Sequence, residues 1–183
     1  MSTVASPFGL KPAFHPSGIV RQAHGTILSG FATNIFQYSP ISILADGSLG
    51  PAAPGARIVG AFMGVEFTRT DGRRAVGNNW EANTVATEIV AYYTEDADLT
   101  YEIQADGSVA VLSRGAQFDW TALAGNATTG LSSVALDTAS GAANAGLRIV
   151  GVNPAADNDF GDAFTIVQVQ ISEHQYRADV AQV

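Results

Sequence analysis

The segment from Leu147 to Arg177 limits the possible folds of this chain more than any other part. Its last strand-like stretch alternates strictly, with apolar residues at Val167, Val169 and Ile171 and polar residues at Gln168, Gln170 and Ser172. Side chains of a β-strand point alternately to its two faces, so this stretch predicts a strand with one buried face. The run L-R-I-V-G-V at 147–152 predicts a second strand, with a turn between the two. No charge occurs on the polar side before Glu173, and we therefore expect Gln168 and Gln170 to contact a partner.

Further strand-forming runs, separated by turns, recur through the rest of the chain. They lie at 35–44, 57–68, 85–93, 99–104, 109–112 and 131–136. Asp-Gly pairs at 46–47, 71–72 and 106–107 indicate hairpins, because glycine accepts a positive φ without steric cost. Helical character is confined to 118–124, where Asp119 and Gly125 predict the start and end of a single turn. This pattern predicts an all-β fold, with one β-sandwich or jelly-roll-like domain over residues 19–183.

The first eighteen residues predict an extended N-terminal arm. Prolines at positions 7, 12 and 16 fix φ and favour extended geometry in the residue before each of them, which excludes a helix or a central strand over 1–18. The arm also carries Phe8, Leu10 and Phe14, which is more apolar surface than a disordered tail usually has. Two interpretations remain open. Either the arm packs on its own domain, or it lies on a neighbouring subunit with these three residues as anchors.

The charge content is low, and this bears on partners. Charged residues make up 14% of the chain, against about a quarter in an average soluble protein, and Lys11 is the sole lysine among nine cations. Such depletion is typical of surfaces buried between proteins, although a sandwich with a Thr-, Ser- and Asn-rich surface gives the same numbers. A net charge of −8 argues against direct binding of nucleic acid. The one dense basic cluster, Arg69, Arg73 and Arg74, would instead pair with carboxylates of a protein neighbour.

No segment predicts a membrane span or a disulfide. The longest apolar stretch, 58–65, is too short to cross a bilayer, and cysteine is absent, which suits assembly in a reducing compartment. The N-terminus does not resemble a signal peptide, so we expect synthesis in the cytoplasm.

Candidate chemistry is sparse. The histidines, His15, His24 and His174, have no metal-ligand spacing on one element. Asp157, Asp159 and Asp162 could supply oxygen ligands to calcium, but the loop departs from the EF-hand pattern and a plain turn is the favoured interpretation. No nucleophile or phosphate-loop motif occurs, and we expect no cofactor and no enzymatic activity. Trp80 and Trp120 are candidates for a sugar-stacking platform, with burial in the core as the alternative.

Several short motifs, in the same order along the chain, resemble a family of tailed-bacteriophage head proteins. They are P-F-G-L-K-P at 7–12, Y-E-I-Q at 101–104, T-G-L-S at 129–132, R-I-V-G at 148–151 and E-H-Q at 173–175. Together they resemble the capsid cement, or head decoration, proteins. The chain departs from that pattern by the two alanines at 155–156, which lengthen the turn before Asp157.

The resemblance implies a structural virion protein with a sandwich or jelly-roll fold. Such a protein would bind the outside of an icosahedral head as a homodimer or homotrimer at a local symmetry axis and bridge neighbouring major capsid protein subunits. It would be made in the host cytoplasm and end on the outer surface of the capsid. The alternative is a glycan-binding β-sandwich module of a fibre or spike, which would expose Trp80 or Trp120.

Overall fold

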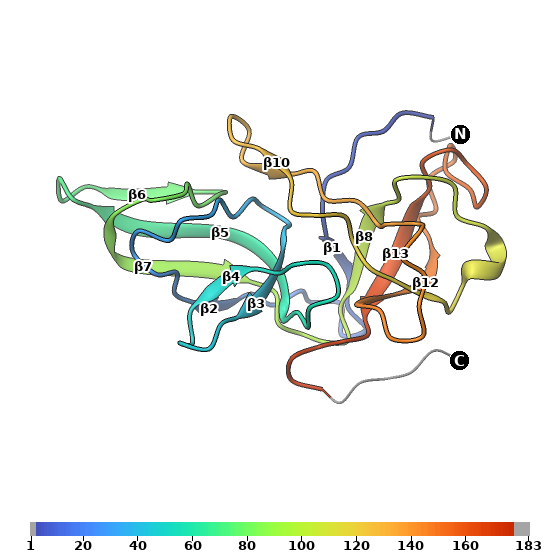
Figure 1. The fold of residues 1–183 in the computed structure, drawn as a ribbon, viewed down its shortest axis with the longest axis horizontal. Coiled ribbons are helices and arrows are strands. Elements are labelled where there is room, and N and C mark those ends of the chain that lie inside the picture. The colour runs from blue at the N-terminus through green and yellow to red at the C-terminus, as the bar shows by residue number, and fades with distance from the viewer. Residues whose placement is uncertain (1–2, 178–183) are drawn as a thin grey trace.

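A computed structural model describes residues 3–177, and it confirms the predicted all-β sandwich class. Two antiparallel sheets, of five and six strands, form one sandwich-like domain (Figure 1). The described residues contain no α-helix, and the one helical element among them is the short 3-10 turn η1 (Val111–Ser113). Across 3–177 there is no helix with the length and hydropathy needed to span a membrane.

The five-stranded sheet is built around the closing hairpin that the sequence predicts. Its order is β1 (Lys11–Phe14), β8 (Thr100–Gln104), β13 (Ile166–Ile171), β12 (Leu147–Val152) and β9 (Gln117–Phe118). Strand β13 pairs with β12 and β8, and its apolar residues Val167 and Val169 are fully buried. The first hydrophobic core lies against this face and also contains Tyr101, Trp120 and Leu147.

The six-stranded sheet holds a second hydrophobic core. Its order is β2 (Ala23–Gly25), β7 (Ala86–Tyr93), β5 (Gly60–Arg69), β3 (Pro40–Ile43) and β4 (Leu49–Pro51), and β6 (Arg74–Gly77) pairs with the far half of β5. Phe62 and Val65 on the long strand β5 are buried, and the ring of Phe67 meets that of Trp80 edge-on at 5.4 Å between centroids. The short pair β10 (Gly125–Asn126) and β11 (Leu131–Ser132) forms a separate hairpin.

Polar contacts tie the two sheets to each other. The hydroxyls of Thr94 and Tyr101 lie 2.8 Å apart in the buried junction, and Thr94 Oγ1 also accepts a hydrogen bond from the backbone N–H of Ala61. The side-chain amide of Gln175 bonds both to the N–H of Ile43, at 2.7 Å, and to its carbonyl, at 3.0 Å. Because the hydroxyls of Thr94 and Tyr101 satisfy each other away from water, they help to fix how the two sheets meet.

The N-terminal arm packs on its own domain, which was one of the two open interpretations. Residues 11–14 form the edge strand β1 against β8. Leu10 is fully buried in the first core, and its backbone N–H donates to the carbonyl of Tyr38 at 2.8 Å. Upstream, the amide of Gln104 binds the backbone of Val4 and Ser6. Gly9 has a positive φ of 81° and passes so close to Tyr38 that a Cβ atom would collide with the carbonyl oxygen.

Three local predictions are wrong. Residues 118–124 form no helical turn, because Trp120 is drawn into the core and bridges to Leu136, while Asp119 accepts a hydrogen bond from the N–H of Gly146. The predicted strand at 109–112 contributes instead to η1, which leaves Leu112 92% exposed. The predicted strand at 131–136 is limited to the two residues of β11.

Candidate interaction surfaces

Gln168 and Gln170 lie half-buried on the outer face of the five-stranded sheet. In the register of the sheet, Gln168 stands opposite Glu102 on β8, and Gln170 stands opposite Arg148 on β12. The polar side of β13 itself carries no charge, but the neighbouring strands bring charges beside both glutamines. The outer face of the five-stranded sheet therefore carries charged residues beside both glutamines. Gln170 also donates to Thr100 Oγ1 at 3.5 Å, so part of its hydrogen-bonding capacity is used within the sheet.

The three predicted anchors of the arm have different environments. Leu10 is part of the core of its own domain, and Phe8 is half-buried. Phe14, at the end of β1, is 57% exposed. Of the three side chains, Phe14 is therefore the one that the fold presents at the surface.

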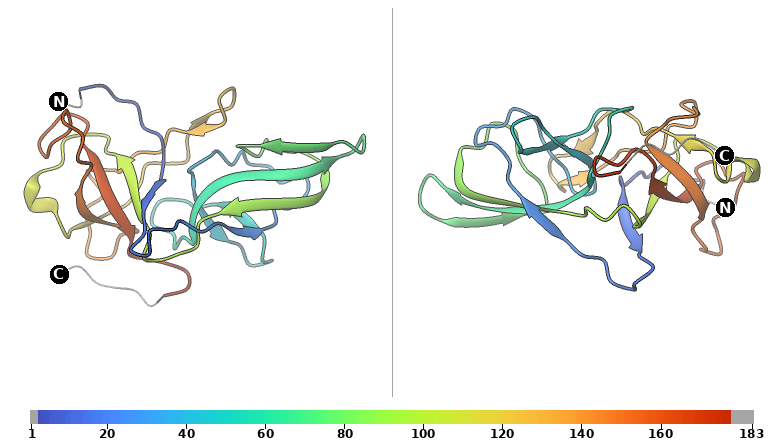
Figure 2. Two further views of the ribbon diagram at one scale, coloured as in Figure 1. Left: turned by 180° about the vertical axis from the view of Figure 1, so that it is seen from behind. Right: turned by 90° about the horizontal axis from the view of Figure 1, so that it is seen from below.

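Phe14 begins an apolar strip that the sequence analysis did not identify. The strip consists of Phe14, Ile19, Val20 and Tyr176, which are between 40% and 60% exposed. Phe14 ends β1, and Ile19 and Val20 lie on the connection between β1 and β2, which protrudes from the body of the molecule (Figure 2). Tyr176 lines a hollow together with Arg21, the residue that follows Val20. The strip therefore consists of exposed apolar residues from the end of the arm and from the region near Arg177.

Polar contacts made by His15 and Arg177 hold the residues next to this strip. The ring of His15 contacts both Ser17 Oγ, at 2.6 Å, and the carboxylate of Asp96, at 3.1 Å. Arg177 donates two hydrogen bonds to the Asp98 carboxylate, at 2.9 and 2.8 Å, and these bonds lower the pKa of Asp98. The protruding connection is therefore tied to the main body.

His174 is buried next to Tyr176 and the same hollow. Its side chain is 1% exposed, and Nδ1 accepts a hydrogen bond from the N–H of Tyr176 at 3.1 Å. Burial lowers the pKa of His174 below the ordinary value of 6.5, because the charged imidazolium would lose its hydration.

The predicted arginine cluster lies at the tip of the β5–β6 hairpin, where its members have separate roles. Arg74 pairs with Glu66 at 3.0 Å and with Glu88 at 3.6 Å. A hydrogen bond from the Tyr92 hydroxyl, followed by the contact with Arg74, lowers the pKa of Glu66. Arg74 is therefore occupied within its own sheet.

The other two arginines differ from Arg74 in their surroundings. Arg73 is 84% exposed and lies 3.6 Å from Asp71. Arg69 lines a hollow beside the hairpin, and within residues 3–177 it has no ion-pair partner. Arg69 is thus the member of the cluster that the fold leaves available to a neighbour.

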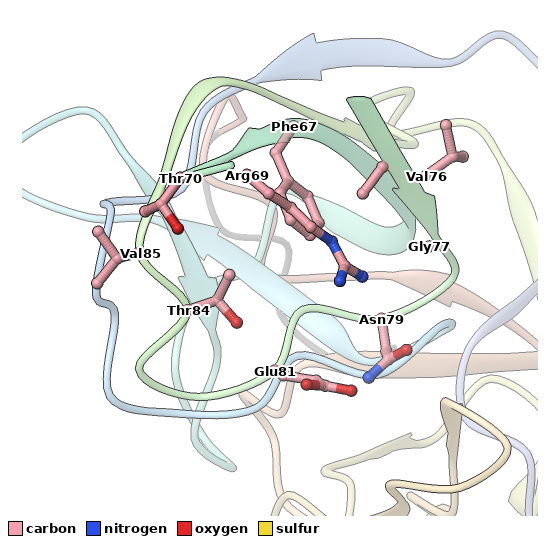
Figure 3. A pocket seen from close by; sticks show the side chains of 10 residues that line it. Phe67, Arg69, Thr70, Val76, Gly77, Asn79, Glu81, Thr84 and Val85 are labelled. Carbon is pink, nitrogen blue, oxygen red and sulfur yellow. The ribbon is translucent and has the colours of Figure 1, made fainter. Parts of the chain in front are cut away.

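The hollow beside Arg69, which we term the tip hollow, has a volume of about 410 Å³. It is lined by Phe67, Arg69, Thr70, Ala75, Val76, Gly77, Asn79, Glu81, Thr84 and Val85. In Figure 3 the guanidinium of Arg69 points into the hollow, on the side of Asn79 and Glu81, while Val76 and Val85 stand on opposite sides. These two valines are 79% and 63% exposed.

The side-chain amide of Asn158 holds together the acidic loop at 157–162. Asn158 is buried and donates to the carbonyls of Asn153 and Ile166, both at 2.9 Å, and it accepts from the N–H of Ile166 at 2.8 Å. The loop is therefore a connector closed by Asn158. Its carboxylates lie around this centre, with Asp157 and Asp159 exposed and Asp162 accepting from the N–H of Asp159. The part of the chain that the structure describes contains no group of three or more potential metal ligands.

The tryptophans do not form a sugar platform. Trp80 is 0% exposed in the second core and Trp120 is 1% exposed in the first. Neither ring offers a face to a ligand, because neighbouring core residues cover it. Both are therefore core residues in this fold.

Neither the strip nor the tip hollow was identified from the sequence. Ile19 and Val20 follow Pro16 and Gly18 and belong to no alternating run. Their position outside a strand was the available signal that these apolar side chains are exposed. The lining of the tip hollow comes from two strands and a loop, so no short motif contains it.

Comparison of the chain with protein-family models, with curated proteins and with solved structures finds no match.

Proposed function

We propose that the protein is a capsid cement protein, which binds the outside of a tailed-phage head and bridges neighbouring major capsid protein subunits. The order of the short motifs supports this proposal, as does the low content of lysine and glutamate. The sandwich-like fold is compatible with it. The role is mechanical, and it requires surfaces that bind proteins.

The apolar strip of Phe14, Ile19, Val20 and Tyr176 is the observation that carries the proposal. A few well-buried side chains, often aromatic, supply most of the free energy of a protein interface. Here Phe14, Ile19 and Val20 lie at or just after the end of β1, where the chain protrudes in Figure 2. Tyr176 lines a hollow together with Arg21, and all four side chains remain 40% to 60% exposed. Such a segment fits a groove between subunits of a shell.

Many weak contacts suffice for such a protein. Copies bound side by side on one shell, or joined as a homodimer or homotrimer, gain affinity through effective concentration. Each strip therefore needs only modest affinity of its own.

Binding to heads assembled without the protein tests the proposal. We expect the purified protein to co-sediment saturably with expanded heads and to raise the temperature at which they release packaged DNA. Replacement of Phe14 and Ile19 together by serine should weaken binding at least about tenfold, because it removes two central apolar contacts.

A matched control separates this effect from a general loss of surface hydrophobicity. Leu112→Ser alters a side chain that is 92% exposed and lies outside the strip, and it should bind heads like the wild type. If the wild-type protein fails to bind heads, or if the double serine variant binds as well as Leu112→Ser, the strip is not the attachment surface of a cement protein. Retention on a glycan array without retention on heads would favour the fibre or spike alternative.

A further inference from the structure

The tip hollow contains groups of opposite charge over an apolar floor. Phe67 forms part of the floor, the guanidinium of Arg69 enters from β5, and the carboxylate of Glu81 lies on the wall formed by the loop after β6. Neither charged group has an ion-pair partner within the described chain. The hollow therefore offers both a strong donor and a strong acceptor.

Asn79 adds a donor that lacks a partner. Its Nδ2 atom is buried and makes no hydrogen bond within residues 3–177. A buried amide without a partner is costly, and a ligand that supplies an acceptor removes that cost. Arg69 and Asn79 together therefore favour a ligand with carbonyl or carboxylate oxygens.

Glu81 narrows the class of ligand. A phosphate or sulfate would be repelled by this carboxylate, whereas a peptide N–H would donate to it. An extended peptide carries N–H and C=O groups along its length, so it can satisfy Glu81 and Arg69 at once. Val76 and Val85, which are 79% and 63% exposed on either side, would then cover an apolar side chain of that peptide.

We propose that the tip hollow is a second docking site, which takes an extended segment of a major capsid protein subunit with an apolar side chain at its centre. This inference rests on the proposed function, and it adds a second contact site at a defined distance from the strip. Strand β7 runs from Tyr93, which pairs with Ala23 just after the strip, to Ala86 beside the hollow. At about 3.3 Å per residue, the two sites are separated by about 23 Å along the strand, which allows one molecule to touch two neighbours.

Two arginine variants test the site. Arg69→Ala should weaken binding to heads at least about tenfold, because a desolvated guanidinium contact is lost. Arg73→Ala is the matched control, since this arginine is on the same hairpin, is 84% exposed and does not line the hollow. It should change binding less than about twofold. Thermal unfolding of both variants verifies that the hairpin is folded.

Photo-crosslinking identifies the occupant. We expect benzoylphenylalanine in place of Val85 to form adducts with one apolar segment of the major capsid protein when decorated heads are illuminated. The same group in place of Leu112, which is 92% exposed, should give few adducts. Adducts with DNA or with a second copy of this chain would overturn the assignment.

The outcomes separate this inference from the proposed function. Wild-type protein that does not bind heads defeats both. If the wild type binds, but Arg69→Ala binds equally well or the Val85 variant gives no more adducts than the Leu112 variant, the docking site is wrong while the cement function stands.

Discussion

Replacement of Leu10 by alanine tests whether the N-terminal arm belongs to the core of its own domain. The Leu10 side chain is 0% exposed among the residues of the first core. Removing three carbon atoms from it costs about 2.4 kcal/mol in transfer free energy, at about 0.8 kcal/mol per group. The remaining cavity raises the expected loss to about 3 to 5 kcal/mol.

Urea or thermal unfolding of the free protein measures this loss. For a chain of 183 residues, a loss of 3 kcal/mol lowers the unfolding midpoint by roughly 6 to 12 °C. Phe14→Ala is the control on the same arm, because its ring is 57% exposed, and it should cost less than about 1 kcal/mol. If Leu10→Ala unfolds within about 0.5 kcal/mol of the wild type, the arm does not occupy the core in solution, and our account of it is refuted.

Three further predictions concern single sites. Burial lowers the folded-state pKa of His174 below 6.5, so protonation favours the unfolded state. The free energy of unfolding, measured by urea titration, should therefore decrease as the pH falls from 6.5 toward 5. His174→Gln should make the free energy of unfolding depend less on pH in this range. An unchanged dependence on pH would contradict the lowered pKa of His174. Asn158→Ala removes three hydrogen bonds and should lower the free energy of unfolding by about 2 to 4 kcal/mol. Asp157 is exposed, so Asp157→Ala should lower it by less than about 0.5 kcal/mol. Equal losses would exclude Asn158 as the residue that holds the loop together. Gly60→Ala should cost about 3 kcal/mol or more in thermal unfolding, because a Cβ atom there overlaps the carbonyl of Thr94, and a loss below about 1 kcal/mol would contradict that close approach.

Period-two alternation made the strands predictable where one face is buried. Residues 166–171 form β13 because Val167, Val169 and Ile171 all reach the same core. The helical turn at 118–124 failed because local signals favoured it, whereas Trp120 gains more by burial in a non-helical segment. The arm prediction was limited in a similar way, since nothing local indicates that Leu10 reaches the core.

The surfaces were less predictable than the strands. The arginines at 69, 73 and 74 form one cluster in sequence, yet the strand pairing brings Glu66 and Glu88 to Arg74 and leaves Arg69 beside the tip hollow. In the same way, Gln168 receives Glu102 as a neighbour from a strand more than sixty positions earlier in the chain. Charge balance at a surface depends on such pairings, which a single segment does not contain.

The burial of Leu10 also bears on how the protein would attach to a shell. An arm that left its own domain to lie on a neighbour would give up the Leu10 contacts, worth about 3 kcal/mol, which corresponds to about a hundredfold loss in binding. The pairing of β1 with β8 would be lost as well. The exposed strip requires no such rearrangement, because Phe14 and Ile19 are already 57% and 60% exposed in the folded protein. Attachment through the strip would therefore cost less than release of the arm, and the buried arm holds Phe14 at the end of β1 with its ring exposed.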